Sequence, residues 1–580
     1  MFRTLTAFIL AGVFIMYCAA ASEIPAPKKI SVSEGYESVI DITGTPILRI
    51  GILSGYKRID FHLDGDYTIT DLSDKPIISD INSDLRWRAK IEESDSADFT
   101  YYVLLKTFGS YTAALDLADT LAAKGYEAKI VEIGNMIRID GIVINDPRKY
   151  RLLLGGFTDE ESCDPLIDEF FEQYNPRVVR SLLNPAKGKV EFYDAEFDFS
   201  GTLDLGFRLI PNAPDSKVIL HKVRIGKGFH WEDTEDRVYP GIVEIRIDHD
   251  GQLQAINEVT IDLYLKGVVP AEMPASYPVE ALKAQAVAAR SEVISKLGAK
   301  HLNDPYDFCA TVHCQVYSGE TKSAQRSSEA VVATTGEVIT FRDRICDAVY
   351  SAVCGGHTEN KENVWNSPAE DYLVGVFDSP SGNGNSFTLQ DSADHHAWVD
   401  SLVPVHCNVL SNGAPPELRG AAKYFRWEET YSRTDLENII RKKTKVDIGT
   451  FYGIELLKRG VSGRLIEIEI LGSRRNLKIK NELNIRRSLS DTHLKSSSFY
   501  ITMNLDPDGV PYEITFHGAG WGHGVGMCQV GAAVMAYKNR DYKTILAHYY
   551  TGTALKRVYT LDSSSYKRKD IKQKAEILED

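Results

Sequence analysis

A dense group of metal-binding residue types lies near the middle of the 580-residue chain, at Cys309, His313 and Cys314. Thiolate sulfur and imidazole nitrogen are the donors that zinc prefers in proteins. The spacing is not that of a zinc finger or ribbon, so a fourth ligand must come from elsewhere, from His357 or His523 for example, or from water. We predict a structural zinc site; a local disulfide or two buried thiols is the alternative.

Glu272 is an acid placed between an apolar run and a helix. The run that begins at Tyr264 has strand character, and strong helix formers without Gly or Pro follow from Ala281. A carboxyl at such a junction can point into a cleft while rigid elements hold it, which makes Glu272 a candidate for acid–base chemistry. The alternative is a solvated loop acid, because Glu is usually exposed.

A glycine-rich stretch forms the third candidate region. Six glycines lie between Tyr512 and Ala536, with His517 and His523 among them, and a helix is predicted to begin around Gln529. Glycine is favoured where the backbone must turn tightly or approach another group closely. The spacing is not that of a phosphate-binding loop, so the stretch does not support a nucleotide site.

Length and composition indicate an exported globular protein of several domains. A chain of 580 residues, 43% hydrophobic and 25% charged, predicts about two to four domains. The net charge of −15 argues against a nucleic-acid partner.

Residues 1–21 resemble a secretory signal, with Arg3 before a short apolar run, and no later stretch is apolar enough to span a membrane. Eight cysteines are too few for a disulfide scaffold, although one disulfide, perhaps Cys346 with Cys354, stays open.

The pattern along the chain predicts an α+β multidomain fold. Alternating strand patterns separated by turn residues mark two β-rich regions, and a β-α-β, β-α pattern lies between them. The predicted parts are a signal peptide at 1–21, β-rich regions at 22–97 and 188–258, an α/β module at 98–184, a mixed α+β domain at 259–560 and a charged tail at 561–580. Within the large domain, 366–425 is polar and turn-rich, and we expect a surface excursion with little structure of its own, suited to a lid.

The module at 98–184 resembles the SPOR domain, a ferredoxin-like α/β fold. The motifs that carry the resemblance are at 102–105, 108–111, 121–126, 154–157 and 159–161. Residues 133–147 depart from the family pattern. The resemblance implies binding to peptidoglycan glycan strands stripped of their stem peptides; a generic α/β module without binding function is the alternative.

The region from about 235 to 560 resembles the SpoIID/LytB family. Its motifs stand in the family's order at 262–274, 281–286 with 289–290, 309–317, 354–358 with Trp365, 497–499 and 522–532. The resemblance implies a lytic transglycosylase that cuts the glycan between N-acetylmuramic acid and N-acetylglucosamine and leaves a 1,6-anhydro end. It places the catalytic glutamate at Glu272 and the metal, a structural zinc, at Cys309, His313 and Cys314.

One carboxyl suffices for the implied reaction, because the sugar's own 6-hydroxyl is the nucleophile. Such a carboxyl needs a raised pKa, and the apolar neighbours Val268, Val269, Met273 and Pro274 are consistent with that. The predicted substrate-binding residues are Lys283, Gln285, Gly522, His523, Gly524 and Gln529. Lys283 can reach back toward the Glu272 turn, although a surface lysine is an equal alternative. For the glycines, a purely structural role is as well supported.

The predicted setting is the periplasm or cell wall, with membrane contact only through a retained signal segment. The predicted partners are peptidoglycan glycan strands and an N-acetylmuramoyl-L-alanine amidase that strips them. Three rival functions remain: a non-enzymatic amidase enhancer, a glycan-binding envelope protein and a zinc hydrolase. The sequence has no HExxH-type pair of the kind that a zinc hydrolase would use.

Overall fold

The computed structural model describes residues 39–42, 44–81, 85–139, 141–226, 232–365, 367–379, 387–411, 413–560 and 578–579. The predicted signal segment lies outside these ranges, as does the predicted tail apart from Leu578 and Glu579. Within the described ranges, no helix combines the length and the apolar character that a bilayer crossing requires. The fold is multidomain and α+β, as the sequence predicts.

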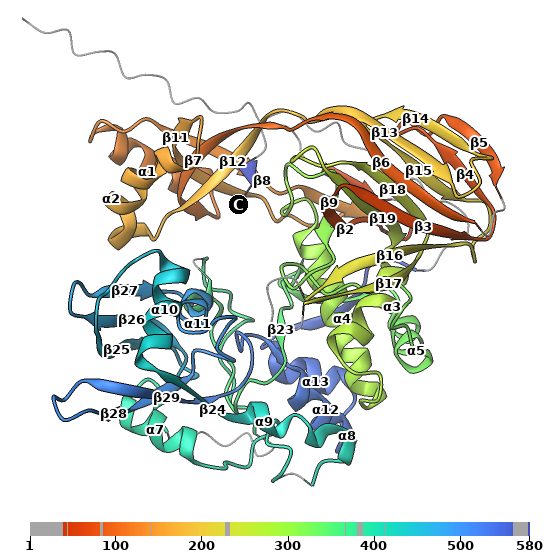
Figure 1. The fold of residues 1–580 in the computed structure, drawn as a ribbon. Helices are drawn as coiled ribbons and strands as arrows, with labels where there is room; N and C mark the ends of the chain where they lie inside the picture. Colours follow the sequence, from red (N-terminus) through yellow and green to blue (C-terminus); the bar gives the residue numbers. More distant parts are fainter. Residues whose placement is uncertain are drawn as a thin grey trace, which may run out of the picture.

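Two antiparallel-rich sheets form the β-rich part and share one apolar core (Figure 1). The seven-stranded sheet has the order β20-β2-β19-β18-β15-β4-β5, and the six-stranded sheet has the order β14-β13-β6-β3-β16-β17. Their strands are β2 (Ile47–Tyr56), β3 (Arg58–Asp64), β4 (Tyr67–Thr70), β5 (Pro76–Ile81), β6 (Arg86–Asp95), β13 (Lys187–Asp194), β14 (Ser200–Asp204), β15 (Gly206–Pro211), β16 (Lys217–Ile225), β17 (Asp233–Pro240), β18 (Ile242–Ile247), β19 (Leu253–Thr260) and β20 (Phe308–Cys309). The edge strand β20 pairs in parallel with β2 and so anchors the candidate metal-binding segment to this sheet.

The α/β module is inserted between two strands that pair with each other, β6 and β13. It runs β7 (Asp98–Phe108), α1 (Tyr111–Ala122), β8 (Ala128–Ile133), β11 (Lys149–Phe157), α2 (Asp164–Tyr174) and β12 (Arg177–Asn184). The order β12-β7-β11-β8 is the ferredoxin-like arrangement, and α1 and α2 share an apolar core with the sheet. The departure at 133–147 is a hairpin of β9 (Met136–Ile139) and β10 (Ile142–Asn145), in which β9 pairs with β1 (Val39–Ile42).

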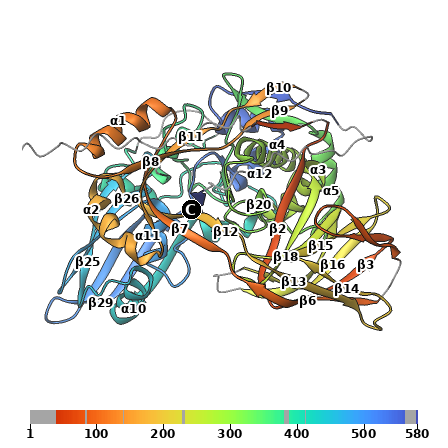
Figure 2. The same cartoon turned by 90° about the horizontal axis from the view of Figure 1, so that it is seen from above.

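The helical core of the large domain is built around α4 (Val279–Lys296). Helices α3 (Ile261–Glu272), α5 (Gln325–Ala333), α12 (Gln529–Tyr537) and α13 (Tyr542–Tyr549) contact it, and Figure 2 shows α12 beside α4. The alanines of α4 are buried because their small side chains let neighbours approach from several sides. The predicted strand character of 264–270 is wrong: these residues belong to α3, which Thr260 caps through a hydrogen bond from the Leu263 backbone N–H.

Residues 426–519 form a second lobe with its own apolar core (Figure 1). Its elements are β24 (Arg426–Ser432), α10 (Arg433–Thr444), β25 (Phe451–Arg459), β26 (Leu465–Gly472), β27 (Leu477–Lys480), α11 (Glu482–Ser488), β28 (Phe499–Leu505) and β29 (Pro511–Ala519). The strand β29 leads out of this lobe into the glycine-rich stretch, which returns to the helical core at α12.

The predicted loose excursion at 366–425 is wrong for the residues that the structure describes there. They include α7 (Ser392–Asp400), α8 (Pro416–Arg419) and α9 (Ala422–Phe425), and Trp398, Val405 and Leu418 are buried in the main core. The apolar anchors are separated by irregular backbone, so no helical or strand period connects them. The segment is therefore part of the domain's packing and does not lie over it as a separate lid.

Candidate active site

Glu272 is the last residue of α3 and is half-buried. The Val316 backbone N–H donates a hydrogen bond to its Oε1 at 2.8 Å. In the described part of the chain, Oε2 has no hydrogen-bond partner. Burial raises the pKa of Glu272 to about 7, with a further contribution from Glu292, while the Val316 hydrogen bond acts in the opposite direction. The carboxyl is thus suited to exchange a proton near neutral pH.

The glycine-rich stretch reaches Glu272 through Gln529. The Gln529 side-chain amide lies 3.1 Å from the Glu272 main-chain oxygen and 3.2 Å from Gln285 Oε1, and donates to both. Gln285 and Gln529 are both buried. The structure therefore brings these two predicted residues together beside the backbone of Glu272, where they support the turn that carries the carboxyl.

The segment that fixes the Glu272 carboxyl is itself held by a buried polar network. Gln315 accepts a hydrogen bond from the Tyr264 hydroxyl and donates one to Glu292 at 2.9 Å. Lys296 also pairs with Glu292, at 2.6 Å. These contacts position the neighbouring Val316 N–H and occupy the other acid of the site.

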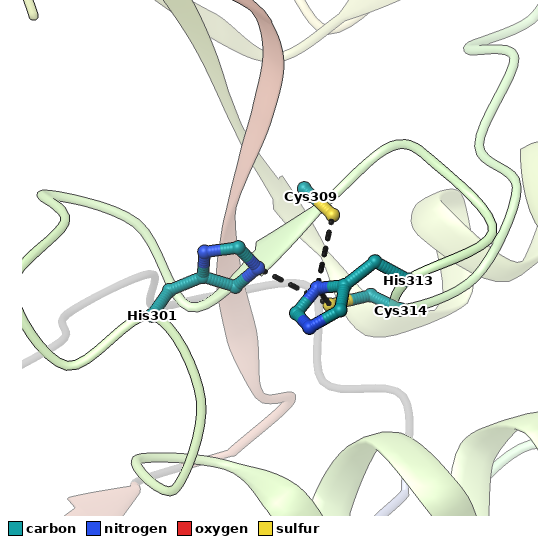
Figure 3. Close-up of side chains that lie close together, drawn as sticks. All are labelled: His301, Cys309, His313 and Cys314. Atoms are coloured by element: carbon teal, nitrogen blue, oxygen red, sulfur yellow. Dashed lines mark hydrogen bonds between the residues drawn. The ribbon is translucent and has the colours of Figure 1, made fainter. Parts of the chain in front are cut away.

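Four potential metal ligands lie together just before this segment (Figure 3). The ligand atoms of His301, Cys309, His313 and Cys314 are all within 4.8 Å of one another. Cys314 Sγ lies 3.3 Å from His301 Nε2 and 3.5 Å from His313 Nδ1, and Cys309 Sγ lies 3.6 Å from His313 Nδ1. Around tetrahedral zinc, sulfur and nitrogen ligands are about 3.6 Å apart, so the donor set and its spacing fit this metal.

His301 is not among the ligands predicted from the sequence, for which the fourth ligand was His357, His523 or water. His301 precedes the cysteines on a loop whose spacing matches no familiar zinc motif. Its other nitrogen, Nδ1, bonds Asp304 at 2.8 Å, the type of outer contact that orients a metal-binding histidine. His357 instead contacts the Thr358 carbonyl, and His523 lies against Trp365.

The remaining predicted residues have different surroundings. Lys283 pairs with Glu280 at 2.7 Å and lies over the Tyr542 ring, so these two groups engage its ammonium. Burial lowers the pKa of His523 to about 3, and its Nδ1 accepts a hydrogen bond from the Val525 N–H. The ring is therefore neutral, with Nε2 as its donor.

Gly522 and Gly524 both have positive φ, at 99° and 76°. A Cβ at Gly524 would overlap the guanidinium of Arg464, which donates to the Gly522 carbonyl at 3.3 Å. These contacts account for both glycines through the tight turn that the loop makes over Arg464.

The fold and the site define a multidomain α+β protein in which a partly buried acid of raised pKa lies between a potential zinc centre and a glycine-rich loop. The stage II sporulation protein (SpoIID) family model matches residues 249–341, and a domain of unknown function, DUF8618, matches 359–526.

Three curated proteins are similar to about half of the chain. An uncharacterized protein of Brachyspira hyodysenteriae is 30% identical over 53% of this chain and 69% of its own length. The amidase enhancer of Bacillus subtilis is 29% identical over 50% of this chain and 40% of its own length. Stage II sporulation protein D of the same organism is 26% identical over 52% of this chain and 76% of its own length. The chain belongs to the SpoIID/LytB family.

Proposed function

We propose that this protein is a lytic transglycosylase that cleaves peptidoglycan glycan strands outside the cytoplasm and forms 1,6-anhydro-N-acetylmuramic acid ends. Family membership supports a role on peptidoglycan. The observation that carries the specific reaction is the Glu272 carboxyl, whose pKa is raised to about 7 and whose Oε1 alone is fixed by a backbone donor.

In the proposed reaction, protonated Glu272 donates its proton to the oxygen of the glycosidic bond as that bond to muramic C1 breaks. The resulting carboxylate then takes the proton from the muramic 6-hydroxyl, whose oxygen bonds to C1. The proton lent in the first step is recovered in the second, so no water is consumed. A pKa near 7 suits both steps, because acid and base forms are both accessible at neutral pH.

The surroundings of Glu272 favour this single-acid route over ordinary glycoside hydrolysis, which uses two carboxylates. The acid that acts on its pKa is Glu292, and Lys296 and Gln315 engage both oxygens of that side chain. Glu292 is therefore engaged by both partners and does not supply a second free carboxylate.

Exposed aromatic side chains lie within and beside the glycine-rich loop and suit the apolar faces of sugar rings. Trp365 lies 4.9 Å from the His523 ring, centroid to centroid, and Trp521 lies 4.2 Å from Tyr424. Both tryptophans are more than a third exposed. We assign glycan contact to these two tryptophan rings.

The cluster of His301, Cys309, His313 and Cys314 would hold a zinc ion in a closed four-ligand site, which stabilises local structure and leaves no open position for substrate. A bound ion would cross-link the loop at His301 to the 309–316 segment. Val316 lies two residues after Cys314, and its N–H fixes the Glu272 carboxyl.

The test is the product formed from purified, peptide-free glycan strands. Wild type is expected to release fragments with 1,6-anhydro ends, and Glu272→Gln to lose about 10²-fold to 10⁴-fold in rate, because the amide neither lends nor takes a proton. Glu329→Gln, which changes an exposed acid on α5, is the matched control and retains activity. Reducing ends formed by water, or equal activity of Glu272→Gln, would overturn the proposal.

An amidase enhancer is the second candidate function, because one relative carries that name. In this case the chain would release no anhydro products alone but would accelerate a purified N-acetylmuramoyl-L-alanine amidase on intact sacculi. Running both assays with wild type and Glu272→Gln separates the candidates, since only the enzyme requires the acidic carboxyl.

We assign glycan binding to the ferredoxin-like module at 98–184. Tethering to strands that an amidase has stripped would raise the local substrate concentration without new contacts at Glu272. Because β6 and β13 pair directly, a short turn after Asp95 can close the chain when the module is removed. The removal also takes Ile137, Ile139 and Ile144 out of the main core, so cooperative unfolding of the shortened chain is verified first. The shortened chain should bind amidase-treated sacculi less well yet cleave at high substrate concentration; unchanged binding would refute this role.

A further inference from the structure

A second cluster of potential metal ligands lies outside the site described above. Its members are Cys354, Asp378, Cys407 and Cys528, with ligand atoms all within 4.8 Å of one another. All four residues are buried, none more than 2% exposed. They come from four separate segments, and the parallel pairing of Tyr350 and Ser351 with Met527 and Cys528 brings two of these together.

The spacing of the cluster fits a tetrahedral metal. Cys354 Sγ lies 3.6 Å from Cys407 Sγ and 3.3 Å from Asp378 Oδ2. Zinc bonds of about 2.3 Å to sulfur and 2.0 Å to oxygen place tetrahedral ligands about 3.8 Å apart for two sulfurs and 3.5 Å for sulfur and oxygen. The seven cysteines within the described ranges are free thiols, so the Cys346–Cys354 disulfide considered from the sequence is wrong.

Two of the three sulfur atoms of the cluster accept hydrogen bonds from the backbone, as thiolate ligands do. Cys528 Sγ accepts from the Cys354 N–H at 3.2 Å and from the Gly531 N–H at 3.4 Å, in the first turn of α12. Cys354 Sγ accepts from the Gly356 N–H at 3.4 Å. Backbone donors and a helix N-terminus both favour a negatively charged sulfur.

Asp378 is oriented by the groups around it. Its Oδ1 accepts a hydrogen bond from the Tyr549 hydroxyl at 2.8 Å and lies 3.4 Å from His548 Nε2, while its Oδ2 faces the thiols. A completely buried carboxylate is costly unless it is compensated. His406 and His548 lie near Asp378 with Tyr549, and on the thiol side Oδ2 accepts a hydrogen bond from the Cys407 N–H at 3.3 Å, where a metal cation would complete the compensation. Outer contacts of this kind commonly fix the orientation of a metal-binding carboxylate.

We propose that Cys354, Asp378, Cys407 and Cys528 bind a second metal ion, a thiophilic divalent cation of the zinc type. Four protein ligands in a closed, buried site make its role structural. The ion would join the 378–407 segment to the end of the glycine-rich loop. Cys528 directly precedes Gln529, which bonds the Glu272 backbone, so the second ion would also steady one wall of the candidate active site.

The first test is the metal content of the full chain, purified under reducing conditions, loaded with zinc chloride and freed of excess by gel filtration. Wild type is expected to retain two zinc ions per chain and Cys407→Ser only one. Cys346→Ser is the matched control, because it removes a buried free thiol outside both clusters, and it should retain two. Equal zinc content in Cys407→Ser and wild type would overturn the proposal.

A second test keeps this cluster intact and removes the other one. In Cys309→Ser/Cys314→Ser, titration with cobalt(II) chloride alone should still give the intense sulfur-to-cobalt absorption of a thiolate site, and adding Cys407→Ser should abolish it. Absence of that absorption in the double variant overturns the proposal. A disulfide between two of the three cluster cysteines would also overturn the proposal, because it would occupy the site. After purification without reductant, such a disulfide would lower the intact mass by one pair of hydrogens and would appear as a cross-link between two of these cysteines.

Discussion

Replacing Glu272 with glutamine should make the stability of the chain less sensitive to pH. The folded state raises the pKa of this carboxyl from its ordinary value of 4.5 to about 7. Below pH 4.5 the carboxyl is protonated in both the folded and the unfolded state, so its ionisation does not change the free energy of unfolding. As the pH rises from 4.5 to 7, the unfolded chain releases the proton while the folded chain keeps it, so stability is lost; above 7 no more is lost. The total is about 3 kcal/mol as an upper value, since each pKa unit is worth about 1.36 kcal/mol.

Glutamine keeps an acceptor for the Val316 N–H and has no charge to bury. We therefore expect Glu272→Gln to unfold like wild type at pH 4 and to be more stable by up to about 3 kcal/mol at pH 8. Urea unfolding followed by tryptophan fluorescence at several pH values measures the difference, with the exposed-site variant Glu329→Gln as control. A difference that is constant across this range, or that has the opposite sign at pH 8, would refute the claim that burial raises this pKa.

Three further outcomes follow from the packing around the site. Gly524→Ala should destabilise the domain by about 1–3 kcal/mol more than Gly509→Ala, because both have positive φ but only the first meets a buried guanidinium; thermal unfolding of the pair measures it. Arg290→Met should cost about 3–5 kcal/mol by leaving Asp262, its partner at 3.0 Å, buried and unpaired, and adding Asp262→Asn should recover part of the loss in urea unfolding. A chelator should lower the melting temperature, with recovery on adding zinc but not magnesium, if the clusters hold metal.

The part of the fold that the sequence predicted best is the part with regular periods. Strand alternation and turn residues located both β-rich regions, and the spacing of apolar residues located the two helices of the ferredoxin-like module.

The sequence itself contains evidence against the strand predicted at 264–270. Ile261, Tyr264, Leu265, Val268 and Val269 are buried at intervals of three and four residues, which is the helical period. The β-branched composition and Pro270 obscured that pattern.

Other features depend on contacts between distant segments, which no local period reports. His301 joins the His301, Cys309, His313 and Cys314 cluster because of the course of its loop. Asp378 and Cys528 lie together although the whole lobe at 426–519 separates them in the sequence. The 366–425 segment looked unstructured for the same reason, since Trp398 and Leu418 anchor it singly to the core.

The placement of Glu272 explains why the site needs a rigid frame on both sides. Its carboxyl is at the end of a helix and gains a raised pKa only while its surroundings stay dry and fixed. Val316 fixes the side chain from the segment that follows the Cys309–Cys314 cluster, and Gln529 fixes the backbone from the residue after Cys528. Each of these two contacts lies next to a group of potential metal ligands. Cross-linking at both places would hold the acid in position without any bond to the acid itself, so Oε2 stays open for the proton that the proposed reaction lends and recovers.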